Sequence, residues 1–268
     1  MALARADLES LLRTRQLDRT LTATRSAERA TPAGCVTNDE AVQATGIDIL
    51  DARLDGGLPR GHLSELVGPR SSGRMSVLLQ LVAEATRRGE LVAIVDALDM
   101  LDVASLEASG AVLDRVLWIR GHVVVNPGLC RDLNQRAMEQ SIRALSLVLQ
   151  ARNCGLVVFD VGEAPVEAIR RLPFTTWLRL QRMVEGSATV CVLVGSVPMA
   201  RSSAGLTIKL GPGLGTHEMG LSGAAVRGGR FDAQVFQGLD LEGRVVRARA
   251  HALEGVSLKV STTACAHV

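Results

Sequence analysis

Residues 68 to 76 read GPRSSGRMS, which is the spacing of a phosphate-binding loop, G-x-x-x-x-G followed by a basic residue. In such a loop a lysine reaches the terminal phosphates and the next residue, a serine or threonine, ligates Mg²⁺. Here those positions hold Arg74 and Met75. Arginine keeps the charge but is planar and differently aimed, and a thioether is not a hard oxygen ligand. Ser76 cannot simply replace the hydroxyl, because one helical step turns it by about 100°.

A phosphate loop also needs a strand before it and a helix after it. HLSELV (62 to 67) is expected to form the strand and residues 75 to 89 the helix, with Gly68 and Gly73 between them. Backbone N–H groups of the turn and the helix N-terminus would then face a bound anion. A second strand, GLVVFD (155 to 160), ends in Asp160, placed as an acid on the metal side.

Three interpretations of the loop stay open: an unrelated glycine turn, a site that hydrolyses nucleotide, or a loop of the right shape that binds nucleotide weakly or not at all. The sequence favours the last. We therefore expect no catalytic residue, no metal site and no required cofactor, and we regard ATP with Mg²⁺ as a doubtful ligand. The residues that would contact it are Gly68, Gly73, Arg74, Ser76 and Asp160.

The surrounding pattern predicts an α/β fold. Near-continuous apolar strands at 91 to 96, 115 to 121, 155 to 160 and 189 to 196 are separated by helical segments, the longest at 131 to 152. Such strands are typical of a mostly parallel central sheet covered by helices on both faces. After residue 200 the pattern changes to strands with tight turns, and we expect the sheet to continue there in antiparallel fashion. These strands are expected at 205 to 211, 229 to 239, 243 to 253 and 256 to 261.

The chain ends are expected to differ from this core. Residues 2 to 21 predict an amphipathic helix with Leu8, Leu11 and Leu12 on its apolar side. So short a helix must pack on something to persist, either a partner or its own core. We expect residues 1–45 to be this helix and a linker, 46–261 the core domain, and 262–268 a flexible tail.

The bulk composition excludes several classes of protein. The chain has 268 residues with 30 basic and 28 acidic side chains, a net charge of +2, which predicts no strong non-specific nucleic-acid binding. The five cysteines show no ligand spacing and are expected to be reduced. No apolar run reaches the roughly 18 residues that span a membrane, and the N-terminus lacks the apolar block of a signal peptide. We expect a cytoplasmic protein without a membrane partner.

Beyond the loop, the stretch ATGIDILDARLDGGLPRGHLSELVGPRSSG resembles the start of the RecA recombinase core. VAIVDALDMLD resembles the next strand of that family, where Asp-Ala-Glu supplies the catalytic glutamate, and LVVFD resembles its Walker B strand. The similarity covers roughly residues 44 to 261 and implies a RecA-like core. The position expected to hold the catalytic glutamate is occupied by Leu98. The position expected to hold the glutamine that senses the terminal phosphate lies near Ser196. Several such losses together point to a motor that no longer works.

One subfamily has these features. RRLPFTTWLRLQRMVEG followed by VCVLVGSVPMARSSAGLTIKL is similar to the characteristic stretch of the ImuA proteins, RecA-like (also described as SulA-like) proteins of bacterial mutagenesis cassettes. The resemblance implies a role in SOS-induced translesion synthesis beside ImuB, a Y-family polymerase homologue, and an error-prone C-family polymerase. It also implies contact with ImuB and RecA. The alternatives are a divergent DNA-stimulated ATPase and a SulA-like inhibitor of cell division.

A group of arginines near the one tryptophan of this stretch has two interpretations. They could form a DNA-facing basic patch or a partner contact, or they could be the solvated face of a helix whose Trp177 packs inward. The residues are Arg170, Arg171, Arg179 and Arg182, with Arg201 farther along the chain.

Overall fold

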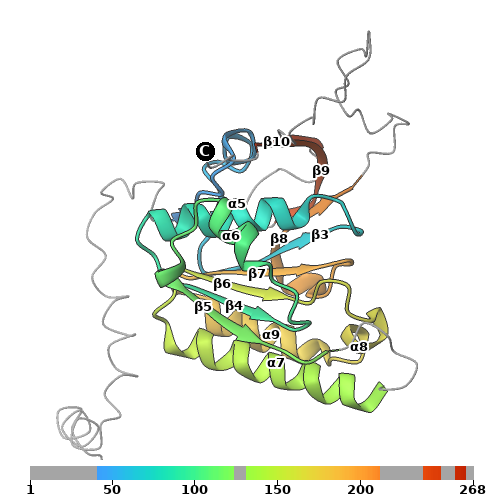
Figure 1. Ribbon diagram of the computed structural model, residues 1–268. Coiled ribbons are helices and arrows are strands. Elements are labelled where there is room, and N and C mark those ends of the chain that lie inside the picture. Colours follow the sequence, from blue (N-terminus) through green and yellow to red (C-terminus); the bar gives the residue numbers. More distant parts are fainter. Residues whose placement is uncertain (1–40, 124–130, 212–237, 249–256, 264–268) are drawn as a thin grey trace, which may run out of the picture. The chain divides into compact units, whose positions relative to one another are not determined.

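The computed structural model describes residues 41–123, 131–211, 238–248 and 257–263. These residues form a mixed sheet in the strand order β10-β9-β8-β3-β7-β6-β4-β5 (Figure 1). The strands β8, β3, β7, β6, β4 and β5 run parallel to one another. β9 runs antiparallel to β8, and β10 runs antiparallel to β9. The strands are β3 (Leu63–Val67), β4 (Val92–Asp96), β5 (Val116–Arg120), β6 (Leu156–Asp160), β7 (Val190–Gly195), β8 (Ala204–Leu210), β9 (Gly238–Ala248) and β10 (Ser257–Thr263).

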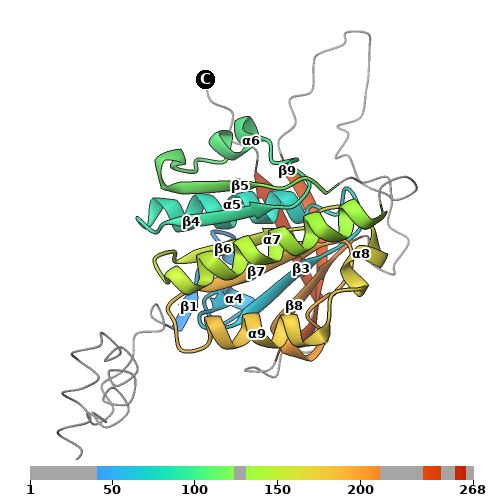
Figure 2. The same ribbon diagram turned by 90° about the horizontal axis from the view of Figure 1, so that it is seen from below.

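Helices cover both faces of the sheet (Figures 1 and 2). α5 (Arg74–Arg87) and α6 (Val103–Ala108) lie on one face, and α7 (Arg131–Ala151) and α9 (Phe174–Val184) lie on the other. Two short helices, α4 (Asp48–Arg53) and α8 (Val166–Arg170), complete the described helical segments, with two 3-10 turns, η1 (Leu113–Arg115) and η2 (Arg201–Ser203). The predicted α/β fold class is confirmed.

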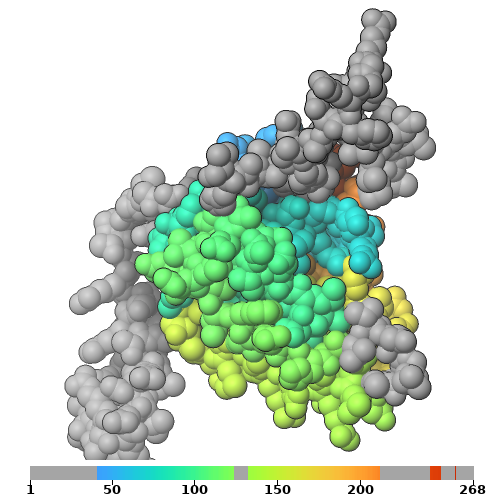
Figure 3. Space-filling model, in the orientation of Figure 1, coloured from blue at the N-terminus to red at the C-terminus, as the bar shows by residue number. Residues whose placement is uncertain are grey.

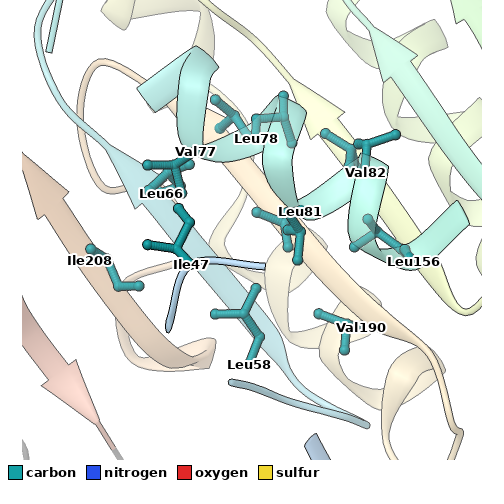
Figure 4. Close-up of a cluster of buried hydrophobic side chains, with 14 of the residues drawn as sticks. Ile47, Leu58, Leu66, Val77, Leu78, Leu81, Val82, Leu156, Val190 and Ile208 are labelled. Atoms are coloured by element: carbon teal, nitrogen blue, oxygen red, sulfur yellow. The ribbon is translucent and has the colours of Figure 1, made fainter. Parts of the chain in front are cut away.

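The core divides into two layers because strand side chains alternate between faces. On β6, Leu156 and Val158 pack toward α5, whereas Val157 and Phe159 pack toward α7 and α9. Figure 4 shows the first layer, in which Val77, Leu78, Leu81 and Val82 of α5 meet strand residues such as Leu66 and Val190. Burial on both faces explains why these strands read as continuous apolar runs.

β5 and β10 are the two edge strands of the sheet. In the space-filling view the surface over α6 and β5 is green and faces the viewer (Figure 3). Leu117 of β5 is 54% exposed, as expected for a strand with a neighbour on one side only.

The segment after residue 200 differs from the expectation in two ways. β8 pairs parallel with β3, so the antiparallel part begins only at β9. The turn expected between residues 239 and 243 is part of β9, where Gly243 pairs with Leu258 on one side and Leu210 on the other. Ladder hydrogen bonds on both sides outweigh the turn preference of a single glycine. The predicted strand over 229 to 239 lies outside the described residues except at its end.

The ends of the core also differ from the sequence boundaries. Val42 and Gln43, placed in the linker, form β1 (Val42–Gln43), which pairs with β2 (Leu58–Pro59). β10 continues to Thr263, inside the expected tail. The predicted N-terminal helix with Leu8, Leu11 and Leu12 lies outside the described residues.

No helix among the described residues is long and apolar enough to cross a membrane.

Candidate functional site

The strand, loop and helix required for a phosphate loop are all present. β3 ends at Val67, the loop follows, and α5 begins at Arg74. Gly73 has a φ of 80°, a left-handed conformation that favours glycine, and it caps α5 without a side-chain hydrogen bond. At Gly68 a Cβ would lie 2.4 Å from both the Leu210 carbonyl oxygen and the Ser72 hydroxyl. Both glycines of the motif are therefore required by the backbone geometry.

Arg74 folds back over this loop instead of pointing outward. Its side chain is buried, and its guanidinium donates hydrogen bonds to the carbonyl oxygen of Gly68 and to the Glu163 carboxylate. Glu163 lies in the turn between β6 and α8. The arginine that the sequence places at the lysine position is thus neutralised by a carboxylate of the protein itself.

The next two residues do not bring an oxygen ligand into the loop. Met75 packs against the core layer under α5. Ser76 is half-buried, and its hydroxyl forms no hydrogen bond within the described residues. The buried hydroxyl of Ser72, inside the loop, has no hydrogen-bond partner among the described residues.

Asp160 lies at the end of β6, beside Asp96 at the end of β4, as expected for parallel strands in register. Its Oδ1 accepts a hydrogen bond of 2.7 Å from the Gly162 N–H. The pKa of Asp160 is raised to about 6, chiefly by burial. The charges of Asp96 and Glu163 also raise it, whereas the Gly162 hydrogen bond and the charge of Arg74 lower it. The acid is therefore in place, but its charged form is disfavoured.

Asp96 has a structural role in the turn that follows β4. Its carboxylate accepts hydrogen bonds from the backbone N–H of Leu98 (3.3 Å) and Leu101 (2.8 Å) and from Trp118 Nε1 (3.3 Å). This turn carries Leu98, which stands where the resemblance expects a glutamate. A Cβ on Gly162 would lie 2.8 Å from Leu98 Cδ1, so the leucine covers the backbone next to Asp160. A leucine has no proton acceptor for water activation.

The arginines of the second candidate group are all exposed. Arg170 and Arg171 end α8, Arg179 and Arg182 lie on α9, and Arg201 begins η2. Trp177 is only 2% exposed and belongs to the core layer under α9, so this tryptophan packs inward, as in the second of the two interpretations. Of the five arginines, Arg170 and Arg201 come together at a hollow between α8, α9 and the segment after β7.

Sequence reasoning missed a buried carboxylate on β3. Glu65 Oε1 accepts hydrogen bonds of 2.7 Å from the N–H groups of Met199 and Ala200, and Oε2 accepts one of 2.8 Å from the Thr207 hydroxyl. The signal was available, since an acid inside a buried strand must be paired. Glu65 fixes the segment between β7 and β8 to the centre of the sheet.

Among the described residues, no group of three or more His, Cys, Asp or Glu side chains is placed to hold a metal ion. Cys154 and Cys191 are buried free thiols, and burial raises the pKa of Cys191 to about 12. The remaining three cysteines lie outside the described residues.

Residues 34–121 match the RecA N-terminal domain, which includes β3, the loop and α5. This match supports a RecA-like core in the chain. It is 28% identical over 173 residues to the RecA protein of Desulfotalea psychrophila, covering 59% of this chain and 45% of that one. It is 27% identical over 164 residues to the RecA protein of Ectopseudomonas oleovorans, covering 61% and 47%.

A higher identity is found over a shorter stretch. Over 74 residues the chain is 45% identical to the RecA protein of Symbiobacterium thermophilum, covering 27% of this chain and 21% of that one. The chain spans less than half the length of each of these three relatives. The similarity to RecA therefore lies in the α/β core of the chain.

Proposed function

We propose that this RecA-related chain is a cytoplasmic adaptor in SOS-induced translesion synthesis, of the ImuA type, that does not hydrolyse ATP. It would link an ImuB-type polymerase homologue to RecA and reach an error-prone C-family polymerase indirectly. The observation that carries the non-catalytic part is the Arg74 side chain, which is bonded to Gly68 and Glu163 across its own loop.

The physical reason is that a phosphate would compete with Glu163 and the Gly68 carbonyl oxygen for the N–H donors of Arg74. A phosphate entering the loop would have to displace Glu163 from Arg74, and a displaced carboxylate close to a phosphate adds repulsion. Mg²⁺ would lack a hydroxyl ligand, because Met75 stands where a phosphate loop has serine or threonine. Leu98 offers no base to activate water. The RecA-type scaffold supports a place in DNA repair, and the role beside ImuB rests on the resemblance described above.

The first test is turnover of ATP by the purified chain, with and without single-stranded DNA. We expect phosphate release equal to the buffer blank and unchanged in Asp160→Ala. DNA-stimulated turnover that Asp160→Ala abolishes would instead establish the divergent ATPase.

Replacing Arg74→Lys together with Met75→Thr is expected to raise the affinity for a fluorescent ATP analogue by about tenfold or more, because charge-assisted contacts to phosphate and a metal ligand return. Titration of the analogue with Mg²⁺ measures this. Arg87→Lys is the matched control, since Arg87 pairs with Glu84 at the other end of α5. Tight binding by the unaltered chain would contradict the proposal.

The adaptor role is tested separately by affinity capture from damaged cells. Recovery of an ImuB-type protein or RecA supports it. Recovery of division proteins, with filamentous cells on overexpression, would favour the SulA-like alternative.

A further inference from the structure

A hollow of about 260 Å³ lies between α8, α9 and the segment Val197–Arg201. We propose that it is a docking pocket for a short acidic motif of a partner protein, which inserts one leucine- or phenylalanine-sized side chain and places its carboxylates on Arg170 and Arg201. This inference deepens the adaptor proposal and rests on it for the existence of a protein partner.

The size and chemistry of the hollow suit an apolar side chain. Its walls include Leu172, Phe174, Trp177, Val197 and Met199. Sites for small organic ligands usually measure about 300–1,000 Å³, so this one is at or below their lower limit. Pockets that receive one anchoring side chain are typical of the central contacts of protein interfaces.

The rim of the hollow is positively charged. Its lining residues include two arginines, Arg170 and Arg201, and no aspartate or glutamate, whereas the whole chain has a net charge of only +2. Arg170 and Arg201 are exposed and form no ion pair with any described carboxylate. A ligand that supplies carboxylates beside an apolar group would complement both the charge and the walls.

The segment carrying Arg201 is held in a fixed conformation. Arg201 has a φ of 49°, a left-handed conformation that costs free energy for any residue but glycine. Glu65 binds the N–H groups of Met199 and Ala200 from within the sheet, and Arg247 donates a hydrogen bond to the Arg201 carbonyl oxygen. A binding surface held in advance loses less entropy on association.

Nucleic acid is the less suitable ligand. Single-strand binding without sequence preference uses exposed aromatic rings as stacking platforms. Trp177 is buried, and Phe174 is partly buried against the core layer under α9. The hollow offers apolar walls to a side chain but no open aromatic face to a base.

The test uses the full chain and labelled synthetic peptides, read by fluorescence anisotropy. The first peptide has one leucine flanked by aspartates, the second replaces the leucine with serine, and the third replaces the aspartates with lysines. We expect saturable binding of the first peptide and at least about tenfold weaker binding of the other two. Equal binding of all three, or of none, would overturn the proposal.

Protein variants separate the hollow from general charge. Arg170→Glu with Arg201→Glu, and independently Val197→Phe, are each expected to weaken the first peptide by about tenfold or more. Arg179→Glu with Arg182→Glu is the matched control, because it makes the same charge change on α9 outside the hollow and should leave binding within about twofold. Thermal unfolding of each variant checks that it is folded.

Other occupants give distinct results. Tighter binding of single-stranded oligothymidylate than of peptide, lost in the same variants, would identify a nucleic-acid site. A dimer that Val197→Phe converts to monomer would identify a second copy of the chain. Either result overturns the proposal.

Capture of the partner separates this inference from the adaptor role. If the unaltered chain and Val197→Phe recover ImuB-type protein or RecA equally, the adaptor stands and the docking pocket is wrong. If neither is recovered but the acidic peptide binds at the hollow, the docking pocket stands and the assigned role is wrong.

Discussion

Glu65→Ala is expected to lower the free energy of unfolding by about 3–5 kcal/mol. The carboxylate is buried in the middle of the sheet and accepts hydrogen bonds from the Met199 N–H, the Ala200 N–H and the Thr207 hydroxyl. Removing it leaves these donors without partners in a place that excludes water, and it also leaves a cavity. Urea denaturation followed by far-ultraviolet circular dichroism measures the change.

Two smaller substitutions divide this effect. Thr207→Val removes one donor together with its hydrogen bond and is expected to cost about 1 kcal/mol. Glu65→Gln keeps the shape and one good acceptor, and should fall between Thr207→Val and Glu65→Ala. A Glu65→Ala variant as stable as the unaltered chain would show that the segment after β7 does not depend on this carboxylate.

The parallel part of the sheet was predictable because burial on both faces leaves a strong sequence signal. β4, β6 and β7 are apolar at every position before their last, and the structure places them within a residue or so of the expected ranges. The C-terminal strands were less predictable, since β9 contains Gly243 and alternates charged with apolar residues. Only the pairing with β8 and β10 determines that this stretch is one strand.

The phosphate loop was predictable in its backbone but not in its side-chain contacts. The spacing of Gly68 and Gly73 fixes the turn locally, so a short sequence motif suffices to find it. The partner of Arg74 is Glu163, which is far away in sequence and becomes its neighbour only when the sheet brings the end of β6 close to the end of β3. No local pattern could identify that contact, or the meeting of Arg170 with Arg201.

The substitutions around the loop are physically consistent with one another. An arginine at position 74 needs a counter-charge once it is buried, and Glu163 supplies it. A methionine at position 75 and a leucine at position 98 add apolar contacts where a nucleotide site would hold a metal ligand and a base. Each change replaces a contact that a nucleotide site would make with a contact inside the protein itself.

The second large effect concerns pH and Asp160. Because burial raises the pKa of this carboxyl from 3.8 to about 6, the folded state binds the proton more tightly than the unfolded chain does. The free energy of unfolding therefore falls as pH rises between these two values, and the contribution levels off above about 6. Asp160→Asn keeps the acceptor for Gly162 but cannot ionise. We expect its stability relative to the unaltered chain to rise by on the order of 2–3 kcal/mol from about pH 4 to about pH 6.5.

Asp99→Asn provides a control of opposite sign. Asp99 is paired with Arg120 at 2.6 Å, and this hydrogen-bonded ion pair lowers the pKa of its carboxyl. The contribution of Asp99 to the free energy of unfolding is present above the ordinary carboxyl pKa and is lost as pH falls. Asp99→Asn should therefore change the stability less at acid pH. Denaturation of the three proteins across the same pH series measures both slopes. If the stability difference between Asp160→Asn and the unaltered chain does not change with pH, Asp160 is solvated in the folded protein. The burial of this carboxyl beside the loop would then be wrong.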